Sequence, residues 1–277
     1  MPKLQLSFHT TFALKKEEVQ KILRCASEDI GLNDSLDNLQ ARTGLGNKKV
    51  TPIKSWATRA GLVEENQLSP EGKMIWDHDP DLETLPTDWF MHFYLSLGDK
   101  RLSTPPQLPS AWGGWTYFVY EFIPQYRSFT EDDLFHHAAL VFDSEKPKPL
   151  KKNLRILLRA YTEPYALAGC KFLILEDGQY QTDQARRPNP YLVGYFLAKL
   201  WERDYPQEGS VLTKSLLTHP MGLGPVLGLT GDGVQDELNR LESLGIIEQR
   251  RAVPPFQVVP RWTNPLDLLE KAYDCDR

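Results

Sequence analysis

The sequence predicts a mainly helical α+β fold in which small β-hairpins interrupt the helices. Three observations support this class. Apolar residues recur three and four positions apart over much of the chain, as they do on one face of a helix. Short β-like pairs bounded by turn residues follow two of these helical runs, near residues 62–68 and 246–259. The middle of the chain carries two aromatic-rich runs, WFMHFYLSL and WTYFVYEFI, which we expect to be buried.

The first three helices are predicted from spacing and capping residues. Residues 15–26 place four apolar side chains on one face, and a second helix follows Asn33-Asp34-Ser35 and stops near two glycines at residues 43–46. A third helix is expected in residues 51–60. Thr51 can cap it, Pro52 suits its first position, and Gly61 suits the left-handed position after its end.

A hairpin is predicted directly after the third helix. Residues 62–64 and 67–68 read as two short strands joined through Glu65-Asn66, and Ser69-Pro70 begins a further helix through residue 76. Helix, tight turn, helix and hairpin is the element order of a winged helix. We therefore expect a winged-helix domain in residues 1–100.

The middle region, residues 101–190, is predicted to be helical. TPPQLPSAWGG has the proline and glycine content of a loop, and Thr130 stands before an acidic first turn, as an N-cap does. NLRILLRAY is expected to form an apolar helix and KFLILE a strand.

A second winged-helix pattern fills residues 191–277. A core-facing stripe in residues 192–201 precedes a helix at 210–217, and Asp232 is expected to cap a helix that ends at Gly245. Residues 246–248 and 256–259 are the expected wing strands, and Asn264-Pro265 begins a closing helix. The predicted architecture is thus two winged-helix domains around a helical, aromatic-rich middle region.

Composition bounds the class of protein. The 277 residues are 41% hydrophobic and 25% charged, which is typical of a globular chain. Three separated cysteines provide neither a disulfide framework nor a CxxC zinc site. No secretory signal or apolar run of about 18 residues is present, so we expect a cytoplasmic protein without a membrane segment. A net charge of −5 excludes indiscriminate coating of nucleic acid.

The distribution of charge points to DNA. Residues 42–63 hold five basic side chains and no acidic one. A short helix with cations and hydrogen-bonding groups on its outward face can enter the major groove. We assign Lys48 and Lys49 to phosphates and Lys54, Thr58 and Arg59 to the groove, and the sequence leaves open whether each groove residue contacts a base or a phosphate. The seven residues expected to contact the duplex are Arg42, Asn47, Lys48, Lys49, Lys54, Thr58 and Arg59.

Two other charged stretches have competing interpretations. Residues 146–159 hold six basic side chains and no acidic one. We interpret this Lys-Pro run as a solvated linker, and the alternative is a second phosphate-contacting strip made by Lys148, Lys151, Lys152 and Arg155. In the second winged segment Asp236, Glu237 and Glu242 would repel phosphate on the supposed recognition helix, so that copy is expected to pack on protein.

No pattern of catalysis or metal binding is recognised. The carboxylates of Asp77, Asp79, Asp81 and Glu83, near His78 and His92, lack a known ligand spacing and are expected to cap helices and hold loops. Neither GxSxG nor a phosphate-binding GxxxxGK[ST] loop occurs. We expect no enzyme activity, no cofactor, no metal and no small-molecule substrate.

Several motifs together resemble the uncharacterised bacterial domain-of-unknown-function family numbered 4007. They are Phe8-His9-Thr10-Thr11-Phe12, LGNKKV at residues 45–50 with Ile53 and Trp56, DPDLE at 79–83 with Trp89 and His92, and WTYF at 115–118 with Glu121-Phe122 and Phe129-Thr130. The chain departs from the family pattern in two places. His9-Thr10-Thr11-Phe12 stands where His-Glu-Thr-Phe is usual, and Pro52 interrupts the helix after Gly-Asn-Lys. The resemblance implies a DNA-associated accessory subunit, similar to components encoded in phage-defence and DNA-phosphorothioation loci.

Three functions remain open from the sequence. The first is a DNA-binding accessory subunit of a multi-protein bacterial phage-defence system for DNA modification or restriction, with double-stranded DNA and other subunits as partners. The second is a protein-protein adaptor that never touches DNA. The third, a transcription regulator of the defence locus, requires a dimer and a palindromic site.

Overall fold

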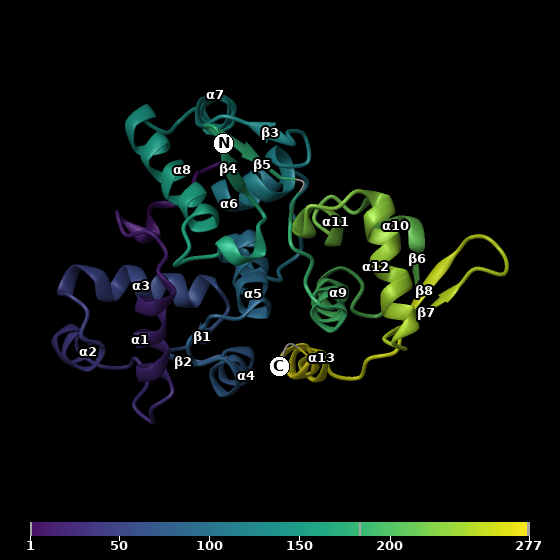
Figure 1. Cartoon of the computed structure of the whole chain (residues 1–277), viewed down its shortest axis with the longest axis horizontal. Coiled ribbons are helices and arrows are strands. Elements are labelled where there is room, and N and C mark those ends of the chain that lie inside the picture. Colours follow the sequence, from purple (N-terminus) through teal and green to yellow (C-terminus); the bar gives the residue numbers. More distant parts are fainter. Residues whose placement is uncertain (1, 183, 276–277) are drawn as a thin grey trace.

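The computed structural model describes residues 2–182 and 184–275, and it confirms a mainly helical α+β protein. Small antiparallel sheets of two and three strands accompany the helices. In Figure 1 the N-terminal helices occupy one side, the middle region lies above them, and the C-terminal elements form the opposite side.

The N-terminal part has the element order that the sequence predicts. Ser35 caps the second helix by accepting from the amide of Asn38, and Gly44 ends it in the left-handed conformation at φ 67°. The hairpin pairs Val63 with Leu68 and Glu64 with Gln67. The elements are η1 (Ser7–His9), α1 (Lys16–Ala26), α2 (Leu36–Thr43), α3 (Asn47–Arg59), β1 (Val63–Glu64), β2 (Gln67–Leu68) and α4 (Pro70–His78).

Helix α3 begins earlier than predicted. It starts at Asn47, after the N-cap Gly46, and not at Thr51, so Pro52 lies inside the helix. Proline there removes one intrahelical N–H donor, yet the buried faces of α3 against α1 and α2 hold the helix together across it. The expectation that Pro52 interrupts the helix is therefore wrong, and Lys48 and Lys49 lie on α3 itself.

The middle region is built on two buried aromatic helical segments. The run from Trp89 to Ser96 is buried throughout in α5, and the run from Trp115 continues α6 into a π-helical turn. Thr130 and Asp133 form a reciprocal capping box at the start of α7. The longer elements are α5 (Leu85–Ser96), α6 (Gly114–Tyr117), η4 (Phe118–Phe122), β3 (Ser128–Phe129), α7 (Glu131–Val141), α8 (Pro147–Thr162), β4 (Ile174–Glu176) and β5 (Gln179–Gln181).

The Lys-Pro run is not a linker. Pro147 occupies the first turn of α8, where its missing N–H costs nothing, and the helix continues for 16 residues. Leu150, Leu154 and Leu157 are buried along one side of it. The interpretation of this run as a solvated linker is therefore wrong, because a helical apolar stripe begins inside the run and fixes it to the core.

The C-terminal part combines helices with a three-stranded antiparallel sheet in the order β6-β8-β7. Its β7–β8 hairpin projects from the body of the molecule (Figure 1). The cap of α12 is Thr230 and not Asp232, which lies in the first turn. The elements are α9 (Pro190–Asp204), β6 (Val211–Leu212), α10 (Thr213–Thr218), α11 (Leu223–Leu227), α12 (Gly231–Ser243), β7 (Ile247–Arg250), β8 (Gln257–Pro260) and α13 (Pro265–Asp274).

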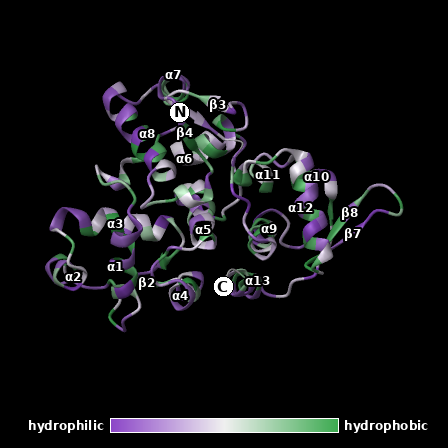
Figure 2. Cartoon of the chain, viewed as in Figure 1, coloured by the Kyte–Doolittle hydropathy of each residue, from purple (hydrophilic) through white to green (hydrophobic). Residues whose placement is uncertain are grey.

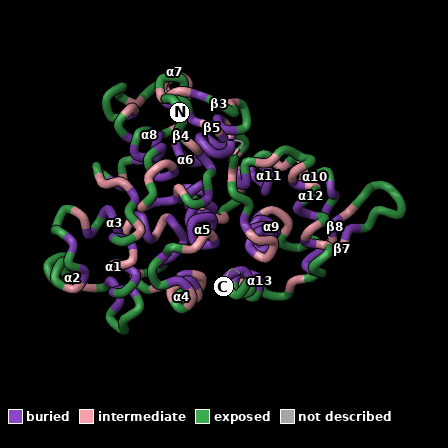
Figure 3. Tube along the Cα trace, in the orientation of Figure 1, coloured by how far each residue is buried: buried purple, intermediate pink, exposed green. Residues whose placement is uncertain are grey.

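One hydrophobic cluster connects the N-terminal, middle and C-terminal elements. Helix α5 lies in its middle and is buried along its length (Figure 3). The rings of Phe93 in α5 and Phe196 in α9 stack at 4.4 Å between centroids. Hydrophilic residues cover much of the peripheral helices α8 and α12 (Figure 2). The domain boundaries at residues 100 and 190 stay a prediction. None of the described helices is both long enough and apolar enough to cross a membrane.

Candidate nucleic-acid interface

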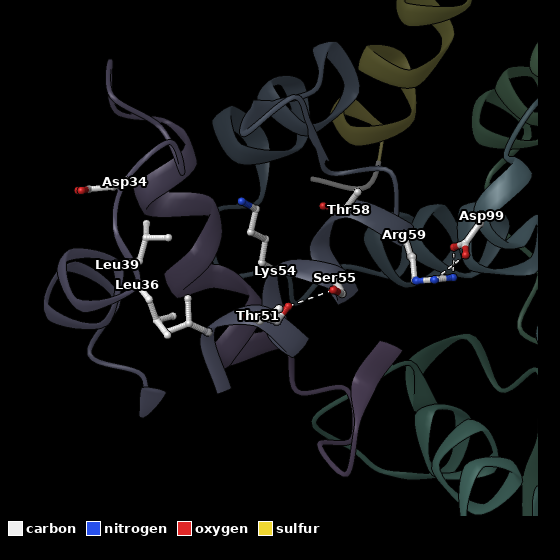
Figure 4. Close-up of a pocket in the computed structure, with 10 residues that line it drawn as sticks. Asp34, Leu36, Leu39, Thr51, Lys54, Ser55, Thr58, Arg59 and Asp99 are labelled. Carbon is white, nitrogen blue, oxygen red and sulfur yellow. Dashed lines mark hydrogen bonds and ion pairs between the residues drawn. The ribbon is translucent and has the colours of Figure 1, made fainter. Parts of the chain in front are cut away.

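An open pocket of about 530 Å³ lies along the outer face of α3. Three of the residues predicted to enter the major groove, Lys54, Thr58 and Arg59, line it together (Figure 4). The remaining lining residues come from the α1–α2 connection, α2, α3 and the segment after α5, and they are Asp34, Leu36, Leu39, Val50, Thr51, Ser55 and Asp99.

Lys54 carries a charge that no carboxylate of the described residues balances by an ion pair. Its ammonium group donates to the side-chain oxygen of Asn66, a neutral partner in the β1–β2 turn, at 2.6 Å. Burial lowers the pKa of Lys54, because partial removal from water disfavours the charged form. The ammonium group of Lys54 is therefore not engaged by a carboxylate, although Asp34 and Asp99 also line the pocket.

Arg59 is held from two sides. Its guanidinium lies 3.9 Å from the centre of the Phe8 ring, and one of its nitrogens donates to Asp99 at 2.6 Å. The side chain of Arg59 is only 19% exposed. The charge that the sequence assigns to the duplex is thus already compensated by a carboxylate of the same chain.

Two more of the predicted phosphate contacts are neutralised in the same way. Arg42 forms ion pairs with Glu28 at 2.8 Å and Asp34 at 3.3 Å, and Lys49 pairs with Glu18 of α1 at 2.5 Å. These pairs fasten α2 and α3 to the preceding elements. We therefore assign them a positioning role in the structure.

Asn47 and Lys48 remain open to solvent at the start of α3. Lys48 has no ion-pair partner in residues 2–182 and 184–275. Together with Lys54 it provides the uncompensated positive charge of α3. Thr51, Ser55 and Thr58 of the same helix add hydroxyl groups to the pocket that Lys54 lines.

In the second predicted strip, on α8, two of the four cations form ion pairs within the chain and two do not. Lys151 pairs with Asp132 at 2.8 Å and Arg155 with Glu131 at 2.7 Å, both in α7. Lys148 and Lys152 are exposed, and the described part of the chain offers neither of them an ion-pair partner. The strip therefore contributes two free cations and not four.

The acidic cluster near residue 79 is structural. Both oxygens of the buried Asp79 accept hydrogen bonds, from the amides of Glu83 at 3.0 Å and Thr84 at 3.1 Å and from the hydroxyl of Thr87 at 2.5 Å. His92 is buried between the hydroxyl of Tyr161 and the carbonyl of Val226. Within the described residues no group of three or more His, Cys, Asp and Glu side chains could hold a metal ion.

The carboxylates of α12 are mostly occupied by arginines. Glu237 is buried and pairs with Arg187 at 3.2 Å and Arg240 at 2.9 Å, and Glu242 pairs with Arg251 from the hairpin. These contacts tie α12 to the sheet and to the segment before α9. Asp236 is exposed on the same helix.

The sequence pattern did not predict the carboxylates that form ion pairs with these cations. Asp99 lies 40 residues from Arg59, and Glu18 lies 31 residues from Lys49. No local pattern links residues at these separations, since tertiary packing brings them together. Phe8 and His9 were missed for the same reason, although His9 stacks on Trp56 at 5.7 Å within the motif that carries the family resemblance.

The fold of the chain is shared with two crystal structures of low sequence identity. They are the SspB crystal structure and the magnesium ion-bound SspB crystal structure, each with a TM-score of 0.72 and 17% identity. The alignments cover 97% of this chain and 86% of each SspB chain. No curated protein matches the chain.

A family model matches residues 6–273, which is nearly the whole chain and includes every predicted contact residue. Its description is "protein of unknown function", DUF4007. The motifs at η1, α3 and the start of α5 all fall inside the matched range. The chain belongs to the DUF4007 family.

Proposed function

We propose that the chain is a non-catalytic DNA-binding accessory subunit that contacts duplex DNA through the outer face of α3. One observation carries the proposal. Lys54 brings a positive charge that no ion pair balances to a pocket that also contains three hydroxyl groups of the same helix, and Lys48 is exposed at the start of that helix. Phosphates attract such cations, and hydroxyl groups donate to phosphate oxygens or base edges.

The elements around α3 support a winged-helix mode of docking. Helices α2 and α3 meet through the turn Gly44-Leu45-Gly46, and the β1–β2 hairpin follows α3 directly. The amide of Leu32, in the connection between α1 and α2, donates to the carbonyl of Asn66 in the hairpin turn at 2.7 Å. At about 1.5 Å per residue the 13 residues of α3 span about 20 Å, a length that the major groove accommodates.

The roles of the seven predicted contact residues differ in this proposal. Lys48 and Asn47 contact phosphates at the exposed start of α3, and Lys54 and Thr58 face the groove. Arg42, Lys49 and Arg59 act as positioning residues, because their charges are engaged by Glu28, Glu18 and Asp99. The helix is thus held rigidly while its two free cations meet the polyanion.

The cellular setting belongs to the proposal as well. The family resemblance supports a multi-protein bacterial phage-defence system, for DNA modification or restriction, in which this subunit works beside others in the cytoplasm. The low-identity SspB structures add support for the fold alone, and the magnesium ion is a feature of that protein.

A protein-docking adaptor is the second candidate, and a specific observation favours it. Three of the five basic residues in the N-terminal site are neutralised within the chain. The projecting β7–β8 hairpin exposes Val253 by 76% and Phe256 by 45%, and exposed apolar side chains of this size suit contact with protein.

The deciding experiment compares two double variants of the full chain. Lys48→Ala with Lys54→Ala removes the free cations of α3, and Lys73→Ala with Lys214→Ala removes two exposed, unpaired cations of α4 and α10 as a matched control. Binding to a fluorescent duplex is followed by anisotropy at several salt concentrations. We expect the slope of log K against log salt to fall by about 0.9 for each lost phosphate contact in the first variant and to stay unchanged in the second.

Two outcomes would contradict the proposal. Equal salt slopes for the two variants would remove α3 as the contact. A wild-type chain that binds no duplex at about 50 mM salt, where polyanion attraction is strong, would leave the adaptor function.

A further inference from the structure

The N-terminal segment, residues 4–16, packs against α3 on one side. Its Phe8 ring lies under the guanidinium of Arg59, and its His9 ring stacks on Trp56. The indole nitrogen of Trp56 donates to the carbonyl of Phe12 at 3.0 Å. The segment is therefore anchored along the second half of α3 by aromatic and hydrogen-bonding contacts.

The two ends of the same segment are fixed to residues that flank α8. The amide of Leu4 donates to Glu145, just before α8, at 3.3 Å, and the amide of Lys16 donates to the carbonyl of Tyr165, just after α8, at 2.9 Å. His9 lies between these two contacts in the chain. The segment thus spans the space between α3 and α8, which Figure 1 shows on the same side of the molecule.

The charges of α3 and α8 meet at this segment. The pKa of His9 is lowered to about 4, chiefly by burial and to a smaller extent by the positive charges of Arg59 in α3 and Lys152 in α8. Phe8 contacts Arg59 of α3, and Leu4, four residues earlier in the same segment, contacts Glu145 at the start of α8. The segment thereby links the beginning of α8 to the second half of α3.

The segment carries exposed hydroxyl groups, and the first turns of α8 carry free ammonium groups. Ser7, Thr10 and Thr11 are exposed, and the turn is held by the amides of Thr10 and Phe12, which donate to Ser7 and His9. On α8, Lys148 and Lys152 are exposed and have no ion pair among the described residues. The acids nearest in α7, Glu131 and Asp132, are occupied by Arg155 and Lys151.

We infer that the DNA-binding surface continues from α3 across the Thr10-Thr11 turn to Lys148 and Lys152 of α8. This inference rests on the proposed function, since α3 provides the first contact. The phosphate backbone leaving α3 would meet hydroxyl donors at the turn and then two ammonium groups. Unbalanced cations of one sign beside hydroxyl groups suit a row of phosphates, because each phosphate contact needs one donor or one positive charge.

The test removes the two cations of α8 from the full chain. Lys148→Ala with Lys152→Ala is compared with the wild type and with the Lys73→Ala, Lys214→Ala control on one duplex of about 30 base pairs. Loss of two phosphate contacts lowers the salt slope by about 1.8. The ratio of the variant Kd to the wild-type Kd then shrinks about 12-fold between 50 and 200 mM salt.

A second readout reports on the turn itself. Thr11→Cys is placed in a Cys275→Ser background because Cys275 is the exposed cysteine. It should form a disulfide with a duplex whose phosphate tethers end in a mixed disulfide, by thiol–disulfide exchange that releases the small thiol. Lys73→Cys in the same background should not. A purely structural role of the turn would give no difference between the two positions.

The outcomes separate this inference from the proposed function. An unchanged slope for the α8 variant and no cross-link at Thr11, together with a reduced slope for Lys48→Ala with Lys54→Ala, would overturn the inference and leave the α3 contact. A reduced slope for the α8 variant alone would support the α8 contact and overturn the role of α3. Absence of duplex binding by the wild type would overturn both.

Discussion

The ion pair between Arg59 and Asp99 allows a prediction in which DNA binding improves. Asp99→Asn keeps the size of the side chain and removes its negative charge from the rim of the α3 pocket. The guanidinium stays on the Phe8 ring, because that contact does not involve Asp99. The variant therefore presents a third free cation beside Lys48 and Lys54.

The size of the effect follows from the exposure of the pair. Arg59 is 19% and Asp99 42% exposed at the side chain, so losing the pair costs the fold only about 0–1 kcal/mol. One additional phosphate contact raises the salt slope by about 0.9. The advantage of the variant over the wild type in Kd then changes by about 3.5-fold between 50 and 200 mM salt.

The assay is anisotropy of a fluorescent duplex across that salt range, beside a thermal unfolding curve. Glu176→Gln in β4 is the matched control, since Glu176 is exposed and forms no ion pair among the described residues. If Asp99→Asn and Glu176→Gln change binding equally, only net charge matters. Arg59 would then have no place in the DNA-binding surface.

Three further predictions concern stability. Asp79→Ala should lower the free energy of unfolding by about 2–4 kcal/mol in denaturant titrations, because buried donors such as the hydroxyl of Thr87 lose their acceptor. A loss below about 0.5 kcal/mol would contradict the structural role of Asp79. His9 has a folded pKa of about 4 against 6.5 unfolded, so the unfolded chain binds more protons and stability falls as pH drops from 6.5 to 4. Between these pH values the stability of wild type relative to His9→Phe should fall by about 3 kcal/mol, and parallel pH profiles would refute this. Amide hydrogens of residues 151–154 should exchange slowly, as expected inside α8; fast exchange there would favour a linker.

Local signals explain the elements that the sequence predicted well. Ser35 and Gly44 bound α2, and Asn264 caps α13, because each side chain or backbone preference acts within a few residues. The β1–β2 hairpin is found at the predicted residues for the same reason: Glu65 and Asn66 take the positive φ angles that its turn requires.

Tertiary contacts decided the features that the sequence did not predict. Packing of α3 on α1 and α2 carries that helix across Pro52, against the local preference of proline. The apolar stripe from Leu150 onward does the same for the Lys-Pro run. The structure brings Lys54, Thr58 and Arg59, three of the residues that the sequence predicts as contacts, to one pocket on α3. The charge balance of α3 depends on Asp99 and Glu18, which are distant in sequence.

Contact between the α3 pocket and a duplex can be measured directly by cross-linking. Ser55, between Lys54 and Thr58, is replaced by cysteine in the Cys275→Ser chain. This variant is mixed with a duplex whose tethers end in a mixed disulfide, which exchanges with the cysteine thiol, and Lys73→Cys is the reference position. A duplex seated on α3 gives a disulfide adduct at Ser55→Cys that high salt suppresses, and little adduct at Lys73→Cys. Equal adducts at both positions, or none at Ser55→Cys while the protein still retains DNA, would contradict the role of α3.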